Sequence, residues 1–503
     1  MRANAKTGNS VTNEGIVMDK VVVSQDYGAI PAKWDETVDV IVIGSGFAGL
    51  SAAIEAHDAG ASVKIIEKMD TAGGNSWING GQVAAAGSAA QKKQGIKDSV
   101  DLMYNDMLVA GLHLNYPHLA KIVAEQSNSA VEWTMQRVGA AYKEHVNMMG
   151  GHSVPRTLQT ANGHGSEVVG KQVEALKKDR VDINFHSKLV KIYRDPGGVV
   201  VGIAMLQGFE IGKPEAGVLK HIRALKGVVL ACGGFSEDLH FRMAQNPTLT
   251  ADYETTNQPG ATAEGLIAAL HIAAAPIQLD QIQLLPLVSP DDKSMGTAPG
   301  FIAGAGMAHG ILVDPDTGKR FVSELADRKV QSDAIIACGH PAVVISDAAG
   351  VKFSWWGLER SLKSGSVKKF DTIAELATSY KIDLASLQST IKDFNGFVAA
   401  KKDPEFGKLI LQDAKPLAEA PFYASRVWPK IHHTMGGVEI NEKAEVLDLD
   451  GNVIPGFYAA GEVTGGVHGA CRLGSVAIID CLVFGRIAGK NVSAAAAMQQ
   501  AAE

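Results

Sequence analysis

One segment near the start of the chain constrains the fold most. Residues 38–43 read VDVIVI, an apolar run typical of a buried parallel strand, and residues 44–49 follow directly as GSGFAG. Residues 50–56 have helical apolar spacing, and a second apolar run at 63–66 ends at Glu67. In such a unit the glycines let backbone amides approach a pyrophosphate at the helix N-terminus, and the acid accepts hydrogen bonds from a ribose. The sequence therefore predicts an α/β fold with a Rossmann-like domain that binds a dinucleotide.

Glycine is over-represented in the chain, with 54 of 503 residues, or about 11% against a usual ~7%. Glycine is needed where the backbone adopts a positive φ or presses against a ligand, so dispersed clusters indicate one large ligand contacted from many points. Ordinary tight turns, and a solvated charge pair at Glu67 and Lys68, are the alternatives. The clusters lie at residues 44–49, 73–81, 233–234, 300–310, 436–437 and 461–474.

Three further segments distinguish FAD from NAD. A glycine-rich loop at 71–81 follows the second strand at once, where an NAD domain would continue with regular βα units. A strand at 227–230 leads into the glycines at 233–234. Residues 454–462, near the other end of the chain, have the same pattern of a strand followed by glycine. An extended FAD contacted by both ends of the chain explains all three segments, so we predict FAD.

Charge and cysteine content exclude several classes of function. The 47 Lys+Arg against 54 Asp+Glu give a net charge of −7 without a basic stripe, so we expect no nucleic acid and no anionic membrane surface as partner. No apolar run reaches the ~20 residues of a membrane helix. The four cysteines stand singly, without a CxxC pair, and no HExxH pair exists, so we predict no metal site.

The first residues of the chain are polar and lack the apolar core of a signal peptide. We expect residues 1–31 to form a flexible leader. We expect a periplasmic location, as for the mature form of an exported protein, with the cytoplasm as the alternative.

Four longer motifs carry a resemblance to a known family. They are GGNSWINGG at 73–81, ETTNQPGATAEG at 254–265, HHTMGG at 432–437 and PGFYAAGEVTGGVHGACRLG at 455–474. With them the chain, from about residue 38 to about 491, resembles the soluble flavoprotein reductases related to fumarate reductase and succinate dehydrogenase. The most similar members are the flavin domains of flavocytochrome c fumarate reductases and their urocanate and methacrylate relatives.

The resemblance implies a discontinuous FAD-binding domain, here 32–279 plus 434–503, and a mobile capping domain at 280–433. Membrane-bound members of the family attach FAD to a histidine in the first glycine loop. No histidine lies between Gly73 and Gly81, so we expect non-covalent FAD. The nucleotide motif and the resemblance together give these FAD-binding residues: Gly44, Gly46, Phe47, Ala48, Glu67, Lys68, Gly73, Gly74, Asn75, Ser76, Gly80, Gly81, Ala231, Gly233, Gly461, Glu462, Arg472, Gly474, Ala477 and Ile478.

The resemblance also implies a catalytic set. In the family, hydride passes from flavin N5 to the β-carbon of an α,β-unsaturated acid, and an arginine of the cap protonates the α-carbon; the matching residue is Arg328. Arginine has a pKa above ~12, but a carbanion beside a carboxylate is a stronger base still. His433 and Arg472 match the residues that hold one substrate carboxylate, for which the planar guanidinium is suited. A solvated Arg328 and a structural ion pair for Arg472 are the alternatives.

The chain departs from the dicarboxylate-specific members of the family at the other end of the substrate. Those members hold a second carboxylate with a histidine and a Thr-Glu pair, and they relay protons through that Glu and an arginine. At these positions this chain has Leu285, Ala303-Gly304 and Met307. A buried carboxylate without partners is strongly disfavoured. We therefore predict a monocarboxylic 2-enoate substrate, such as acrylate, methacrylate or a cinnamate-like acid, over fumarate.

Three residues are candidates to replace the lost proton relay, namely Glu324, Asp327 and His309. The chain has neither a haem motif nor iron–sulfur cysteines, so we expect a separate electron donor, either a c-type cytochrome or a flavoprotein. The alternative functions are a ketosteroid-type flavin dehydrogenase, a fumarate or urocanate reductase, and a flavin electron carrier without substrate chemistry.

Overall fold

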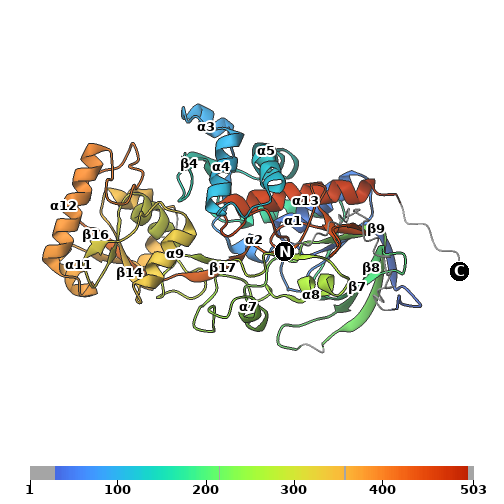
Figure 1. Ribbon diagram of the computed structural model, residues 1–503. Coiled ribbons are helices and arrows are strands. Elements are labelled where there is room, and N and C mark those ends of the chain that lie inside the picture. Colours follow the sequence, from blue (N-terminus) through green and yellow to red (C-terminus); the bar gives the residue numbers. More distant parts are fainter. Residues whose placement is uncertain (1–28, 214–215, 356–357, 497–503) are drawn as a thin grey trace, which may run out of the picture.

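The computed structural model describes residues 29–213, 216–355 and 358–496. Most of the expected leader at 1–31 lies outside these residues. Figure 1 shows a larger lobe built from both ends of the chain and a smaller lobe, yellow and orange, built from its middle. Across the described residues, no helix combines the length and apolar character needed to cross a membrane.

An eight-stranded sheet forms the centre of the larger lobe, with the path β19-β20-β9-β1-β2-β6 and the β7–β8 hairpin joined to β9. The strands β20, β9, β1, β2 and β6 run parallel, and the apolar residues of β1 are buried because helices cover such a sheet on both faces. The bounds are β1 (Glu36–Ile43), β2 (Val63–Ile66), β6 (Ile183–Asn184), β7 (Ser187–Arg194), β8 (Val200–Gln207), β9 (Val218–Leu230), β19 (Glu445–Leu447) and β20 (Val453–Ala459).

The first and last helices of the larger lobe pack closely against each other (Figure 1). A Cβ on Gly485 of α13 (Val476–Ala494) would lie 2.5 Å from the carbonyl oxygen of Ala48 in α1 (Phe47–Asp58), so glycine permits the contact. The lobe also contains α2 (Asn75–Ile78), α3 (Ala89–Lys93), α4 (Val100–Ala110), α5 (Pro117–Trp133), the π-helix η1 (Thr134–Val138), α6 (Ser166–Lys178), α7 (Leu239–Gln245), α8 (Glu264–Leu270), and the short strands β3 (Gln82–Ala84), β4 (Tyr142–Asn147), β5 (Thr157–Thr160), β10 (Pro276–Ile277) and β18 (Gly437–Val438).

The smaller lobe has its own antiparallel sheet, in the order β13-β12-β14-β16-β15. Two apolar clusters of buried residues pack in this lobe, apart from the core of the larger lobe. Its elements are the π-helix η2 (Phe301–Ala308), β12 (Ile311–Asp314), β13 (Lys319–Arg320), α9 (Arg328–Ala337), β14 (Ala342–Ser346), η3 (Gly350–Phe353), α10 (Leu358–Ser364), β15 (Lys368–Phe370), α11 (Ile373–Tyr380), α12 (Leu384–Ala400) and β16 (Phe422–Val427).

Two antiparallel strands lie where the chain passes between the lobes. β11 (Ile282–Leu285) pairs with β17 (Lys430–Thr434), and Gln283 lies opposite His433 in their register. Figure 1 shows β17 between the two lobes. The expected domain limits at residues 279/280 and 433/434 fall close to these two strands and stay predictions.

Candidate active site

The first of two neighbouring cavities lies at the carboxyl ends of the parallel strands, because residues directly at the ends of β1, β2, β9 and β20 line it. This edge is where α/β sheets bind nucleotides. The residues expected to bind FAD that line this cavity are Gly44, Gly46, Phe47, Ala48, Glu67, Lys68, Gly73, Gly74, Asn75, Ser76, Ala231, Gly233, Gly461 and Glu462.

The wall of this cavity at the start of α1 can be built only with glycine. Gly44 has a φ of 101°, and a Cβ there would lie 2.4 Å from the carbonyl oxygen of Ala231. Gly46 is the N-cap of α1 and has no capping side chain, so the first turn of the helix presents backbone amides to the cavity. A helix N-terminus of this kind binds a phosphate group.

Glu67 holds the strand end and the glycine turn together. Its Oε2 accepts hydrogen bonds from the backbone N (3.0 Å) and Oγ (2.6 Å) of Ser45, and its Oε1 accepts one from the backbone N of Met69 at 2.9 Å. The carboxylate is buried yet lines the cavity. The backbone N of Phe47 in the first turn donates to Oγ of Ser76 at 3.0 Å. The buried carboxylate of Glu67, the helix N-terminus and the bare glycine backbone fit the ribose and pyrophosphate of FAD.

The second cavity brings together the three residues expected to carry the chemistry, Arg328, His433 and Arg472. Arg328 comes from α9 of the smaller lobe, whereas Arg472 comes from the loop before α13 of the larger lobe. Other expected residues that line this cavity are Phe47, Asn75, Ser76, Gly80, Leu285, Glu462, Ala477 and Ile478. Because Phe47, Asn75, Ser76 and Glu462 also line the first cavity, the two cavities adjoin.

Gln283 links the two arginines, and the sequence did not single it out. Nη1 of Arg328 donates to Oε1 of Gln283 at 3.3 Å, and Nε2 of Gln283 donates to the carbonyl oxygen of Arg472 at 2.8 Å. The same Nε2 lies 3.0 Å from Sγ of Cys471, a buried thiol whose pKa is raised by burial. The sequence signal that could have found Gln283 is its place two residues before Leu285, because alternate residues of a strand share a face.

Two buried nitrogens on the cavity wall lack hydrogen-bond partners within the described structure, Nε of Arg472 and Nδ1 of His433. Neither Arg328 nor Arg472 forms an ion pair with any described carboxylate. Burial lowers the pKa of Arg472 to about 10, and burial together with the charge of Arg472 holds the pKa of Arg328 well below its usual value. Burial and Arg472 also lower the pKa of His433, which is therefore neutral. These groups suit an anion placed between them.

Three further titratable side chains surround this set. Nδ1 of His432 lies 2.7 Å from the hydroxyl of Thr256, and burial lowers the pKa of His432. Glu462 accepts a hydrogen bond from the backbone N of Thr434 at 3.0 Å, and burial raises its pKa to about 7. His468 stands behind His433 with 5.5 Å between ring centroids. His432 is half-buried and His468 is buried, and neither residue was assigned a role from the sequence.

The residues expected at the distal end of the substrate lie around three different cavities. Leu285 lines the second cavity, Ala303 and Met307 line a small cavity that Arg328 also lines, and Gly304 lines a larger outer cavity. All four are buried. Apolar residues contributed by the middle of the chain also line the second cavity, namely Leu285, Leu287, Met295, Pro299 and Trp355.

The three candidates for a proton relay have different surroundings. Glu324 is fully buried, accepts hydrogen bonds from Arg320 at 2.7 and 2.8 Å, and shares the small cavity with Arg328. Asp327 caps the N-terminus of α9. His309 stacks on Phe353 with 3.7 Å between ring centroids and lines the outer cavity.

Two of the expected FAD residues line neither the first nor the second cavity. A Cβ on Gly81 would lie 2.1 Å from Oγ1 of Thr160, so this glycine serves packing within the lobe. The carbonyl oxygen of Gly474 accepts a hydrogen bond from Nε2 of His152 at 2.7 Å. His152 thereby supports the loop that carries Arg472.

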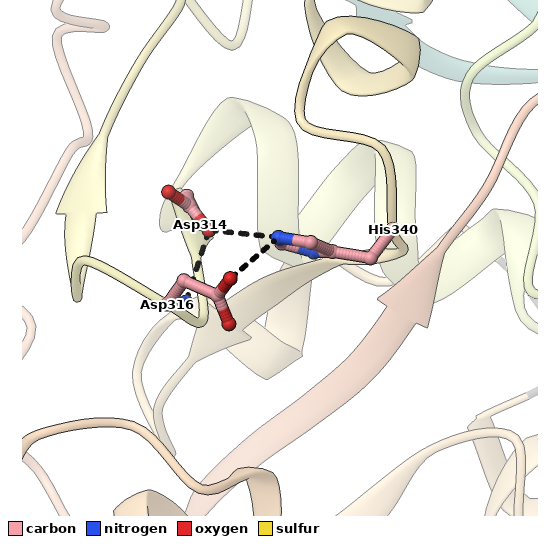
Figure 2. Close-up of side chains that lie close together, drawn as sticks. All are labelled: Asp314, Asp316 and His340. Carbon is pink, nitrogen blue, oxygen red and sulfur yellow. Dashed lines mark hydrogen bonds and ion pairs between the residues drawn. The ribbon is translucent and has the colours of Figure 1, made fainter.

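One group of metal-ligating residue types lies outside both cavities (Figure 2). Nε2 of His340 is 3.5 Å from Oδ1 of Asp314 and 3.3 Å from Oδ2 of Asp316. The Asp314 carboxylate also accepts hydrogen bonds from the backbone N of Asp316 and the hydroxyl of Thr317, which are contacts within the β12–β13 turn. The turn explains the cluster, and the expectation of no metal stays a prediction.

Known proteins are similar to this chain in sequence and in fold. The FAD binding domain family matches residues 39–478. The chain is 41% identical to the acrylate reductase flavoprotein subunit of Shewanella woodyi, over 95% of each chain. It is 37% identical to the fumarate reductase (cytochrome) of Shewanella frigidimarina, over 93% of this chain and 79% of that protein. The open conformation of a flavocytochrome c3 fumarate reductase superposes with a TM-score of 0.70 at 36% identity, over 92% of this chain and 79% of that one.

The predictions of FAD, of an α/β fold and of an oxidoreductase acting on the C=C bond of unsaturated acids are thereby confirmed. The chain belongs to the fumarate reductase-like family of FAD-dependent flavoproteins.

Proposed function

We propose that this chain reduces the C=C bond of a monocarboxylic 2-enoate, such as acrylate, methacrylate or a cinnamate-like acid, in preference to fumarate. The observation that carries the proposal is the asymmetry of the second cavity. Arg328, His433 and Arg472 lie on its wall, two of them with unpaired buried nitrogens, while the residues that replace the family's ligands for a second carboxylate are apolar, with Leu285 in the lining.

The carboxylate of the substrate binds to Arg472 and His433. Arg472 is suited to pair with both carboxylate oxygens, and neutral His433 supplies a further hydrogen bond. A second carboxylate, as in fumarate, would face Leu285 and its apolar neighbours without a partner, which is a costly arrangement for a buried charge. The site therefore favours a substrate with one carboxylate and disfavours a substrate with two.

Arg328 supplies the proton. When bound, FAD provides the hydride that adds to the β-carbon, and a guanidinium nitrogen of Arg328 gives a proton to the α-carbon, so the double bond becomes a single bond. The lowered pKa of Arg328 brings this group closer to acid function. Gln283 orients the guanidinium, and Glu324 is the relay candidate that shares a cavity with Arg328.

Electrons reach FAD from a separate donor, either a c-type cytochrome or a flavoprotein. The sequence contains no CxxC pair that could hold a haem or contribute to an iron–sulfur cluster. The relative from Shewanella woodyi is named a flavoprotein subunit, in agreement with a donor on another chain.

A ketosteroid-type dehydrogenase is the second candidate, because apolar residues also line the second cavity. Such an enzyme handles protons with tyrosines, and no tyrosine is among the described residues that line the second cavity. Oxidation of a 3-ketosteroid with an artificial electron acceptor would favour this candidate.

The test uses the holoenzyme with its FAD photoreduced in the absence of oxygen. Acrylate, methacrylate, cinnamate, urocanate and fumarate are added in turn, and the return of the oxidised flavin spectrum is followed. We expect a monocarboxylate to reoxidise the flavin fastest. Faster reoxidation by fumarate would overturn the proposal.

A further inference from the structure

Trp355 occupies a boundary between three cavities. It lines the second cavity, the small cavity beside Arg328 and the larger outer cavity, and no other described residue lines all three. The indole therefore stands between the site that holds Arg328 and the space outside it.

The indole packs against bare backbone of η2. A Cβ on Gly304 would lie 2.8 Å from Cδ1 and 2.9 Å from Nε1 of Trp355, and 2.1 Å from the carbonyl oxygen of Phe353. Any side chain at residue 304 would thus require the indole to move. The backbone N of Trp355 donates to the carbonyl oxygen of Gly300 at 3.1 Å, which fixes the start of this segment to the same helix. The aromatic ring fills the space that the absent side chain leaves.

The volumes on the two sides of the indole differ several-fold. The second cavity measures about 150 Å³, and the outer cavity about 770 Å³. The second cavity is also bordered by Asn75, Ser76, Ala477 and Ile478, residues expected to contact FAD, so the flavin ring and the substrate share its space. The outer cavity is several times larger than the second cavity, so the indole separates the site from a space that could hold a long substituent.

We propose that Trp355 sets the upper size limit of the substrate. The indole closes one end of the site, so short 2-enoates such as acrylate and methacrylate fit, and acids with a longer or aromatic β-substituent are rejected by steric conflict with the ring. This inference rests on the proposed function and narrows it to short 2-enoates.

The test compares the holoenzyme with Trp355→Ala, Trp355→Phe and the control Leu409→Ala, in which an exposed residue lining only the outer cavity is truncated. Reoxidation rate constants of the photoreduced flavin are measured with acrylate, trans-2-hexenoate and cinnamate. A hydrophobic pocket discriminates about tenfold or more per methylene group. We therefore expect Trp355→Ala to raise the hexenoate-to-acrylate and cinnamate-to-acrylate ratios at least about tenfold, Trp355→Phe to raise them less, and Leu409→Ala to leave them unchanged.

Unchanged or lowered ratios in Trp355→Ala would overturn the inference, and so would an equal rise in Leu409→Ala. A lowered cinnamate ratio would identify the indole as a stacking partner for an aromatic substrate instead. The flavin spectrum establishes that each variant retains FAD. If the wild-type enzyme reduces none of the 2-enoates, the proposed function itself fails; if it reduces acrylate and only the ratios disagree, the inference about Trp355 alone fails.

Discussion

Replacing Arg472 with methionine tests the carboxylate clamp most directly. Arg472 is buried, its Nε lacks a hydrogen-bond partner in the described structure, and its charge is not paired by a carboxylate. A hydrogen bond to a charged group contributes about 1.5–3 kcal/mol, so losing a bidentate pair removes about 3 kcal/mol even when His433 retains part of the contact. Each 1.36 kcal/mol corresponds to a factor of ten, so kcat/KM for acrylate should fall by about two orders of magnitude.

The assay measures kcat/KM for acrylate and for acrylamide, which has the same alkene without the negative charge. Arg472→Met should lower the acrylate value far more than the acrylamide value. Arg486→Met is the matched control, because Arg486 also belongs to the last part of the chain but pairs with Glu55, away from the second cavity. An unchanged acrylate-to-acrylamide ratio in Arg472→Met would refute the assignment of the clamp.

Three other predictions concern the supports of the site. Gln283→Leu should lower kcat for acrylate about tenfold or more, with FAD content unchanged, because Arg328 loses its hydrogen bond; full activity would contradict this role. Gly44→Ala should yield protein with little FAD by absorbance, because its Cβ would collide with the carbonyl oxygen of Ala231, and a full complement of FAD would contradict the geometry. Burial and the charge of Arg156 lower the pKa of His152 to about 4 from 6.5. The folded state therefore disfavours protonation of His152, so its contribution to the free energy of unfolding should be complete above pH 6.5 and should be lost as the pH drops towards 4. Urea denaturation should show a shallower fall of the free energy of unfolding with pH in His152→Gln.

The nucleotide-binding unit could be predicted from the sequence because its signals are local. Residues 38–43 and 63–66 were expected to be strands, and the structure has β1 at Glu36–Ile43 and β2 at Val63–Ile66 with α1 between them. The strand pattern, the glycine turn and the helical spacing can each be recognised within a few consecutive residues. The same locality explains why so many glycines expected to contact FAD line the first cavity.

Contacts between distant segments could not be predicted in this way. Gln283 and Arg472 are 189 residues apart in the chain yet joined by a hydrogen bond, and Gln283 lies opposite His433 because β11 pairs with β17. Trp355 packs on Gly304 across a turn of the smaller lobe, and no periodic pattern indicates this contact. Glycines also proved to have more than one role, since Gly485 permits the packing of α13 on α1 rather than contact with a ligand.

The two arginines also resolve a chemical difficulty of the proposed reaction, since an isolated guanidinium is a poor acid. Burial, and after it the charge of Arg472, lower the pKa of Arg328, so the residue that binds the carboxylate also contributes to the acidity of the proton donor. Gln283 tolerates this pairing because it is neutral: it accepts a hydrogen bond from Arg328 and donates to the backbone of Arg472 without neutralising either charge. A carboxylate in place of Gln283 would hold Arg328 equally well but would raise its pKa and weaken it as an acid. The neutral amide at residue 283 therefore suits the proposed chemistry as well as the geometry.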